Sequence, residues 1–218
     1  MRDSKIMYPN RSMTKHKKTQ LNTSDKTIRP TLRSYLENKY RDNQKITIID
    51  ELGVNHGSSR VDMAVMDGII HGYEIKSDKD SLLRLPLQIE AYNAVFSSVT
   101  IVTGRHHLEA VIDMVPEWWG ILLAKHSSAG VALSEIRDCL PNDSQNPIAL
   151  ARLLWRDEAL GILQELNEAK GFRSKPRGVI YEKLASLLDT KTLQELVQKI
   201  LLSRVNHRFG SAPVLHGD

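Results

Sequence analysis

Hydrophobic and polar residues alternate through the middle of the chain, on both sides of the turn-forming pair Asp67-Gly68. Residues 60–66 and 69–76 are rich in Val, Ile and Met, which is typical of two strands joined as a hairpin. Most large apolar residues then share one face, and the acidic residues share the other with a lysine. The predicted faces are Val61, Met63, Val65, Ile69, His71, Tyr73 and Ile75 on one side, and Asp62, Ala64, Ile70, Gly72, Glu74 and Lys76 on the other.

The register of this hairpin determines whether its polar residues can act together. A three-residue loop over 66–68 places Asp62 opposite Gly72, with Glu74 diagonal to Asp62 on the same face. Diagonal neighbours lie roughly 7 to 8 Å apart at the backbone, so the two carboxylates can meet on one cation with oxygen ligands at roughly 2 Å. Lys76 points the same way. The plain alternative is a surface ion-pair cluster, worth about 0 to 1 kcal/mol.

The spacing of apolar residues elsewhere predicts a mixed order of helices and strands. A turn-rich segment over 141–147 separates these elements from a C-terminal region with helical spacing. The predicted elements are a helix over 30–41, a strand over 45–52, the hairpin, a helix over 85–96, a strand over 99–103, a helix over 108–115, a strand over 121–124, and helices over 148–166, 177–188 and 192–205.

The polar residues of the hairpin resemble the signature of the PD-(D/E)XK nuclease superfamily, an acid on one strand followed by Glu-x-Lys on the next. The matching residues are Asp62 and then Glu74-Ile75-Lys76. The proline that names the first motif is replaced here by Val61. This combination implies a metal-dependent phosphodiesterase.

The resemblance extends beyond the hairpin. The segment from Gln88 to Tyr92 is similar to the Gln-x-x-x-Tyr motif of the RecB-like branch, placed on the helix after the third strand. The string HGYEIKSDKDSLLRLPLQIEAYN, followed by VTIVTG and VPEWWG, also resembles a family of uncharacterised bacterial proteins assigned to that superfamily. A further acid of the family's site is expected from Glu51, or from Glu37 on the first helix. The resemblance covers roughly residues 30–125.

The resemblance implies an α/β fold with a restriction-endonuclease-like αβββαβ core and a small helical appendage. We therefore expect a basic tail over 1–29, the nuclease-like core over 30–126 and the appendage over 127–218. The implied activity is hydrolysis of phosphodiesters, in DNA first of all, with Mg²⁺ or Mn²⁺ as the cofactor. The implied metal ligands are Asp62, Glu74, the carbonyl of Ile75 and Glu51, and the implied catalytic residues are Asp62, Glu74, Lys76, Gln88 and Tyr92.

Composition limits the other possibilities. With 218 residues and 41% hydrophobic content, the chain can bury a sizeable core. No apolar run approaches the roughly 18 residues of a membrane span, and no signal-peptide core is present, so we expect a cytoplasmic protein that does not bind membranes. Cys139 is the single cysteine and has no Cys or His partner set, which argues against structural zinc.

The net charge of +4 is unevenly distributed. Residues 1–29 carry eight Lys or Arg against two Asp, and their low hydrophobicity predicts a disordered segment. Such an arm either binds phosphates, with an affinity that falls steeply with salt, or only keeps the chain soluble.

Two further places are candidates for nucleic-acid contacts. Arg173, Lys175 and Arg177 surround Phe172 in a loop between predicted helices, where they either hold a backbone and stack a base or simply face solvent. Arg84, before the helix over 85–96, is a candidate phosphate contact or a solvated side chain. Trp118, Trp119 and Trp155 are expected in the core.

Two other functions are compatible with the same residues. A nucleic-acid-binding module would keep the fold without turnover. An immunity or regulatory protein would use the helical appendage to dock another chain, or a second copy of itself. Intact acids and the lysine favour the nuclease.

Overall fold

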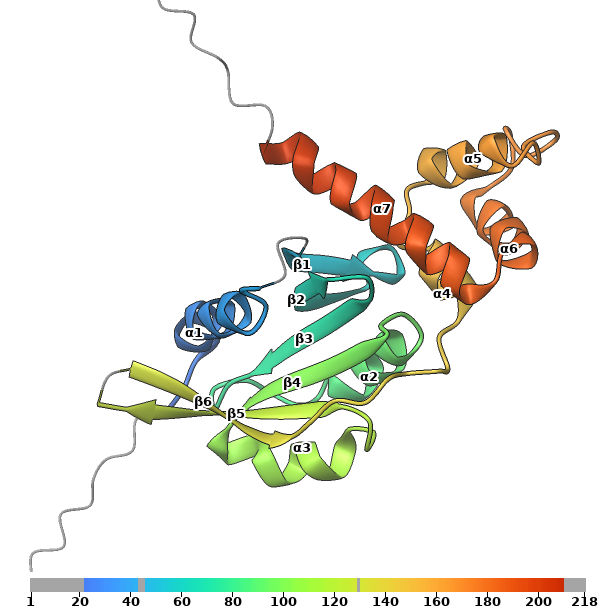
Figure 1. Cartoon of the computed structure of the whole chain (residues 1–218). Helices are drawn as coiled ribbons and strands as arrows, with labels where there is room; N and C mark the ends of the chain where they lie inside the picture. The colour runs from blue at the N-terminus through green and yellow to red at the C-terminus, as the bar shows by residue number, and fades with distance from the viewer. Residues whose placement is uncertain (1–21, 43–45, 129, 210–218) are drawn as a thin grey trace, which may run out of the picture.

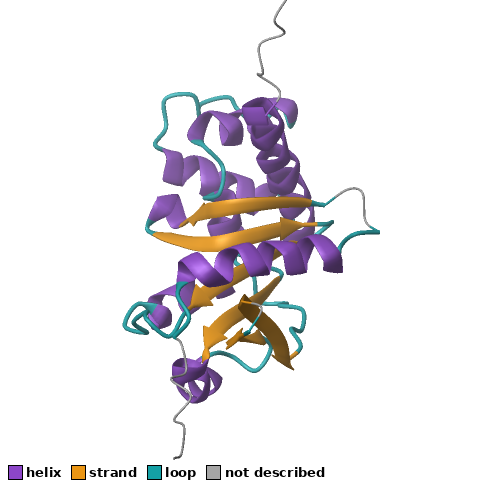
Figure 2. Cartoon of the chain, turned by 90° about the vertical axis from the view of Figure 1, so that its left-hand side faces the viewer, coloured by secondary structure: helices purple, strands orange, loops and turns teal. Residues whose placement is uncertain are grey.

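In a computed structural model, the structure describes residues 22–42, 46–128 and 130–209. These residues form a six-stranded sheet with helices on both faces (Figures 1 and 2). The elements are α1 (Asp25–Lys39), β1 (Thr47–Val54), η1 (Asn55–Gly57), β2 (Ser59–Met66), β3 (Ile70–Lys76), α2 (Leu85–Asn93), β4 (Ser98–Gly104), η2 (Arg105–His107), α3 (Leu108–Met114), β5 (Gly120–Ser127), β6 (Gly130–Arg137), α4 (Pro147–Ala151), α5 (Arg156–Glu165), α6 (Arg177–Leu187) and α7 (Thr190–Phe209).

The sheet follows the order of the chain from β1 to β6. The first three strands are antiparallel, β3, β4 and β5 are parallel, and β6 is antiparallel to β5. Parallel strands are usually covered on both faces because helices form their crossovers. Here α2 connects β3 to β4, and every residue of these two strands is buried.

Two hydrophobic clusters cover the two faces of the sheet. On one face, Ile28, Leu32 and Leu36 of α1 pack against Met63 and Tyr73. Their spacing of four residues puts the three α1 side chains on one side of the helix. Each buried side chain of this size contributes about 1.5 to 3 kcal/mol. The other face packs against α2 and the C-terminal helices through Ala64, Met66, Ile70, Phe96, Leu150, Leu154, Ile180 and Leu193.

The predicted hairpin register is wrong by two residues. Ala64, and not Asp62, pairs with Gly72, and Met66 pairs with Ile70. The loop therefore runs over 67–69. A shift of two keeps every strand residue on its predicted face. The prediction failed because it assumed a single apolar face, whereas the C-terminal helices also bury Met66 and Ile70 on the acidic face.

Helix α1 begins at Asp25, not at Pro30 as predicted. The backbone N–H of Ser24 donates to Thr27 Oγ1 over 3.0 Å, which stabilises the first turn. Pro30 is tolerated inside the helix although it lacks a backbone donor. The last part of the expected basic tail is therefore helical, whereas residues 1–21 of that tail lie outside the described residues.

The region over 127–218 was expected to be helical, but its first part is a strand. β6 pairs with β5 and extends the sheet to Arg137. Most of β6 is exposed, as is common for an edge strand, and this weakened its hydrophobic signal. The helix predicted over 148–166 is broken between α4 and α5. Within the described part of the chain, no helix combines the length and the apolar character required to cross a bilayer.

Candidate active site

A cleft of about 1240 Å³ opens between the sheet, α2 and α4. Its walls carry acidic and basic side chains in similar numbers. Asp62 on β2 and Glu74 and Lys76 on β3 line it, and α2 adds Gln88. The other charged residues along the cleft are Asp25, Arg29, Glu51, Arg60, Asp80, Arg84, Glu90 and Arg152.

The Glu74 carboxylate is the centre of a buried hydrogen-bond network. Lys76 Nζ lies 2.5 Å from Glu74 Oε1, and Gln88 Nε2 donates to the same oxygen over 2.7 Å. The Tyr92 hydroxyl lies 2.8 Å from Glu74 Oε2. The side chains of Glu74 and Lys76 are only 3% and 7% exposed. The structure thus brings three of the predicted site residues around the carboxylate of a fourth, Glu74.

Burial raises the pKa of Glu74, against the opposing effect of Lys76. The Tyr92 hydroxyl also lies 2.7 Å from the carbonyl oxygen of Arg60, a second acceptor. Burial likewise raises the pKa of Tyr92, so this hydroxyl keeps its proton at neutral pH. The ring of Tyr92 packs in the core against Phe96 and Trp119. Tyr92 therefore serves both the core and the Glu74 network.

Asp62 lies in the same cleft with both carboxylate oxygens engaged. Its Oδ2 accepts the backbone N–H of Ile75 over 2.7 Å, and its Oδ1 accepts from Arg29 Nη2 over 2.5 Å. Burial raises the pKa of Asp62, although both hydrogen bonds act to lower it. Two partly desolvated carboxyl groups on adjacent strands form a site where added positive charge is favoured.

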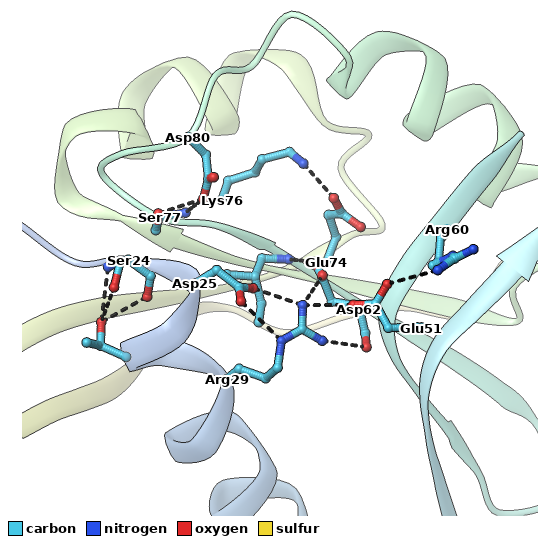
Figure 3. Close-up of polar contacts among 12 residues, drawn as sticks. Ser24, Asp25, Arg29, Glu51, Arg60, Asp62, Glu74, Lys76, Ser77 and Asp80 are labelled. Carbon is cyan, nitrogen blue, oxygen red and sulfur yellow. Dashed lines mark hydrogen bonds and ion pairs between the residues drawn. The ribbon is translucent and has the colours of Figure 1, made fainter.

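Arg29 lines the same cleft and contacts its acids, although the sequence pattern did not indicate it (Figure 3). Its guanidinium lies 2.9 Å from Asp25, 3.1 Å from Glu51 and 2.5 Å from Asp62, and it also donates to the Asp62 carbonyl oxygen. The sequence pattern predicts a disordered segment over 1–29 and a helix that starts at Pro30, which leaves Arg29 outside the folded core. The available signal was the four-residue spacing of Asp25 and Arg29, which suits a helical ion pair.

Glu51 lies beside Asp62, as expected, because its neighbours Asp50 and Leu52 pair with Met63 and Val61. It adopts a left-handed backbone conformation with φ 55°, which is uncommon for a residue with a side chain. Glu37, the alternative acid, is exposed on α1 and does not line the cleft.

The donor set fits a hard divalent cation in its chemistry. Asp62, Glu74, Glu51 and the Ile75 carbonyl offer only oxygen atoms, which Mg²⁺ and Mn²⁺ prefer. The buried Gln88 Oε1 has no hydrogen-bond partner within the described residues and can accept from a water molecule. No group of three or more His, Cys, Asp or Glu side chains in those residues is already arranged around a common ion position. A cation held by Asp62 and Glu74 would have to displace some of their present hydrogen-bond partners.

The predicted nucleic-acid contacts fall in two places. Arg84 is exposed at the cleft, between the exposed Leu83 and Leu87. The other three cations are also exposed, and none of them lines the cleft. Arg173 and Lys175 lie on the segment that joins α5 to α6, and Arg177 is the first residue of α6. The aromatic ring in that segment, Phe172, packs partly buried against the core, with Lys183 Nζ 5.9 Å from its centroid.

The tryptophans divide between core and surface. Trp119 is fully buried and Trp118 packs partly buried beside it. Trp155, expected in the core, is instead 61% exposed. It precedes α5, and the Arg204 guanidinium stacks on its ring at 4.2 Å from the centroid. The prediction failed here because the helix expected over 148–166 is divided into α4 and α5, and Trp155 lies in the turn between them.

Comparison with known proteins identifies the family. The family model described as bacteriophage P4 protein cII matches residues 17–212. Protein cII of Enterobacteria phage P4 is 28% identical over 151 residues, which cover 69% of this chain and 56% of that protein. The chain thus spans about half the length of this curated relative. A solved protein of unknown function from Silicibacter pomeroyi gives a TM-score of 0.36 at 17% identity, over 63% of this chain and 89% of that one. This chain belongs to the bacteriophage P4 protein cII family.

Proposed function

We propose that this chain is a divalent-metal-dependent nuclease that hydrolyses phosphodiester bonds, in DNA first of all. The observation that carries the proposal is the buried Glu74 carboxylate, with Lys76, Gln88 and Tyr92 directed at it in a cleft shared with Asp62. A surface ion pair is a poor explanation, because both partners are almost fully buried. Burying such a pair is costly and seldom favours stability, so its presence in the cleft supports a functional role.

The order of elements supports a PD-(D/E)XK core. From α1 through β1, β2 and β3 to α2 and β4, the chain follows the αβββαβ order of that superfamily. Asp62 lies on the second strand, Glu74 and Lys76 on the third, and Gln88 and Tyr92 on the helix that follows. All five motif positions thus fall on the elements that the superfamily would require.

Asp62, Glu74 and the Ile75 carbonyl are the proposed ligands of Mg²⁺ or Mn²⁺, with Glu51 as a further acid. The Ile75 N–H points to Asp62, and in an extended strand the N–H and C=O of one residue face the same neighbour. The carbonyl of Ile75 therefore also points toward β2. When bound, the cation supplies a Lewis acid that polarises the phosphoryl oxygen and activates water.

The remaining residues position the reacting groups. Lys76 holds a positive charge beside the Glu74 carboxylate, where it stabilises the charge that develops on the phosphorus oxygens. Gln88 and Tyr92 fix the Glu74 orientation. Exposed Arg84 and Arg152 line the same cleft and are the proposed contacts to the nucleic-acid backbone.

The test is to incubate the purified full chain with single- and double-stranded DNA and RNA, in Mg²⁺, Mn²⁺ or EDTA. We expect metal-dependent cleavage that falls at least about 100-fold in Lys76→Met, because a preorganised charge is lost. Lys79→Met is the matched control, since Lys79 is exposed on the loop that follows β3. It should leave the rate unchanged.

Two other outcomes would contradict the proposal that this chain is a nuclease. Binding of nucleic acid without cleavage, unaffected by EDTA, would favour a binding module. A stoichiometric protein partner that co-purifies with an inactive chain would favour an interaction protein.

A further inference from the structure

We propose that Arg29 is the resident cation of the carboxylate site and that it competes with the divalent metal for Asp62. This inference rests on the proposed metal-dependent function. It assigns the first helix a part in setting metal affinity, because Arg29 reaches the site from α1.

Each nitrogen of the Arg29 guanidinium has a polar partner. Nε donates to Asp25 over 3.2 Å, and Nη1 donates to the Asp62 carbonyl oxygen over 3.1 Å. Nη2 lies within 3.1 Å of carboxylate oxygens from Asp25, Glu51 and Asp62. One guanidinium therefore neutralises acids from α1, β1 and β2. Figure 3 shows it between them.

Arg29 and a metal cannot share this position. Mg²⁺ holds its oxygen ligands at about 2.0 to 2.1 Å and demands near-octahedral geometry. Arg29 Nη2 lies 2.5 Å from Asp62 Oδ1 and 3.1 Å from Glu51 Oε1, so a metal held by both of these oxygens would take its place. A guanidinium left beside the metal would also repel it, since like charges at short range raise the energy. The guanidinium must withdraw when the metal binds.

The structure allows Arg29 to withdraw without unfolding α1. The Arg29 side chain is 26% exposed and lies at the cleft, so it has a path to solvent. The helix is held independently by Ile28 and Leu32 in the core. Its N-terminal end is also anchored, since the Thr23 N–H and hydroxyl donate to Asp78 over 2.7 and 2.8 Å.

Lys76 has no such freedom. Its side chain is 7% exposed and its partner Glu74 is 3% exposed, so this pair stays in place when the cleft is occupied. The two cations of the site therefore differ in role. Lys76 remains beside the reacting groups. Arg29 is exchanged for the metal, and this exchange lowers the apparent affinity of the site for the metal.

Mn²⁺ binding to the metal-free full chain, measured by titration calorimetry, tests this exchange. We expect Arg29→Gln to bind Mn²⁺ roughly tenfold or more tightly than wild type, which corresponds to about 1.4 kcal/mol. Arg33→Gln is the matched control, because Arg33 lies one turn further along α1 and pairs with Asp50 outside the cleft lining. Its affinity should equal that of wild type. Asp62→Asn should weaken binding in either background.

A merely structural role for Arg29 predicts the opposite sign, because a loosened α1 would weaken the site. Equal or weaker Mn²⁺ binding by Arg29→Gln would therefore overturn the exchange while leaving metal-dependent catalysis intact. Absence of Mn²⁺ binding in wild type and variant alike would overturn both. Circular dichroism checks the fold of each variant. If Arg29→Gln does not fold, Arg29→Lys replaces it, since a point charge spans fewer carboxylates and should also bind Mn²⁺ more tightly than wild type.

Discussion

His71 shows how a single buried side chain can make the fold sensitive to pH. Its ring is buried on β3, with Nε2 2.9 Å from Thr100 Oγ1 and the Tyr73 ring stacked on it. Burial lowers the pKa of His71 from 6.5 to about 3. The unfolded chain therefore binds more protons than the native chain between these two values, and the free energy of unfolding falls as the pH drops below 6.5.

We expect His71 to lower the free energy of unfolding by about 1.4 kcal/mol for each pH unit below 6.5. Urea unfolding between pH 7.5 and pH 5 checks it, with His71→Gln as the comparison. The variant starts less stable, because it loses the stacked ring, but lacks this part of the pH dependence. Parallel pH profiles for the two proteins would show that His71 is not held neutral by burial.

The two acids of the site give a second pH dependence. Burial raises the pKa of both Asp62 and Glu74, and a metal binds only to the ionised carboxylates. Mn²⁺ binding should therefore strengthen as the pH rises from 5 to 7.5 and release protons. Calorimetry in buffers of different ionisation enthalpy measures that release. A proton count of zero throughout this pH range would contradict the raised pKa of these two acids.

At this scale the sequence revealed the two acids and the partners of Glu74, but not Arg29, the partner of Asp62. Strand alternation places Asp62, Glu74 and Lys76 on one face in both the predicted and the observed register, because the two registers differ by two residues. Arg29 escaped because its contact with Asp62 spans 33 positions and depends on where α1 begins.

At the scale of elements, the loop after β3 is held by a close approach between backbones. A Cβ added at Gly104, the end of β4, would lie 2.4 Å from Asp78 Oδ1 and 2.6 Å from the Asp78 nitrogen. Asp78 also accepts from Thr23 and from the His106 N–H. Gly104→Ala would therefore displace the anchor between this loop and α1, and overpacking of this kind costs about 1 to 3 kcal/mol.

Gly161 provides the matched comparison. It lies inside α5, and an added Cβ there would meet no atom within 4 Å. Gly161→Ala should raise the free energy of unfolding by about 0.5 to 1 kcal/mol, because Ala favours the helix. Thermal unfolding of both variants measures the contrast. A neutral Gly104→Ala would show that the loop can move aside without loss.

The elements themselves were mostly predictable where tertiary packing agrees with the local pattern. The strands β2 to β5 and the helices α2, α3 and α6 fall close to their predicted ranges. β6 was missed because an exposed edge strand needs few apolar residues. The break between α4 and α5 was missed because apolar spacing continued through it, while Leu153 and Leu154 are buried in the turn.

At the scale of the whole molecule, the C-terminal helices and the sheet share one hydrophobic cluster. Leu193 of α7 is fully buried in it together with Met66 and Phe96 of the sheet region. Polar contacts reinforce the join. The Ser97 hydroxyl donates to Gln194, and Gln198 donates to the Ile69 carbonyl oxygen, both over 2.8 Å. This shared interior favours a single cooperative unit rather than a core with a separately folding appendage over 127–218.

Leu193→Ala, a substitution in α7, tests that cooperativity. Removing this side chain should lower the free energy of unfolding by about 2 to 5 kcal/mol, because it leaves a cavity in the shared cluster. In a Trp155→Phe background, the remaining fluorescence comes from Trp118 and Trp119, which lie next to β5. If the chain unfolds as one unit, Leu193→Ala shifts this fluorescence midpoint in urea as far as the circular dichroism midpoint. If the helices fold separately, the fluorescence midpoint stays where it was and only the dichroism moves, so the two probes decide whether α7 stabilises the strands that carry the site.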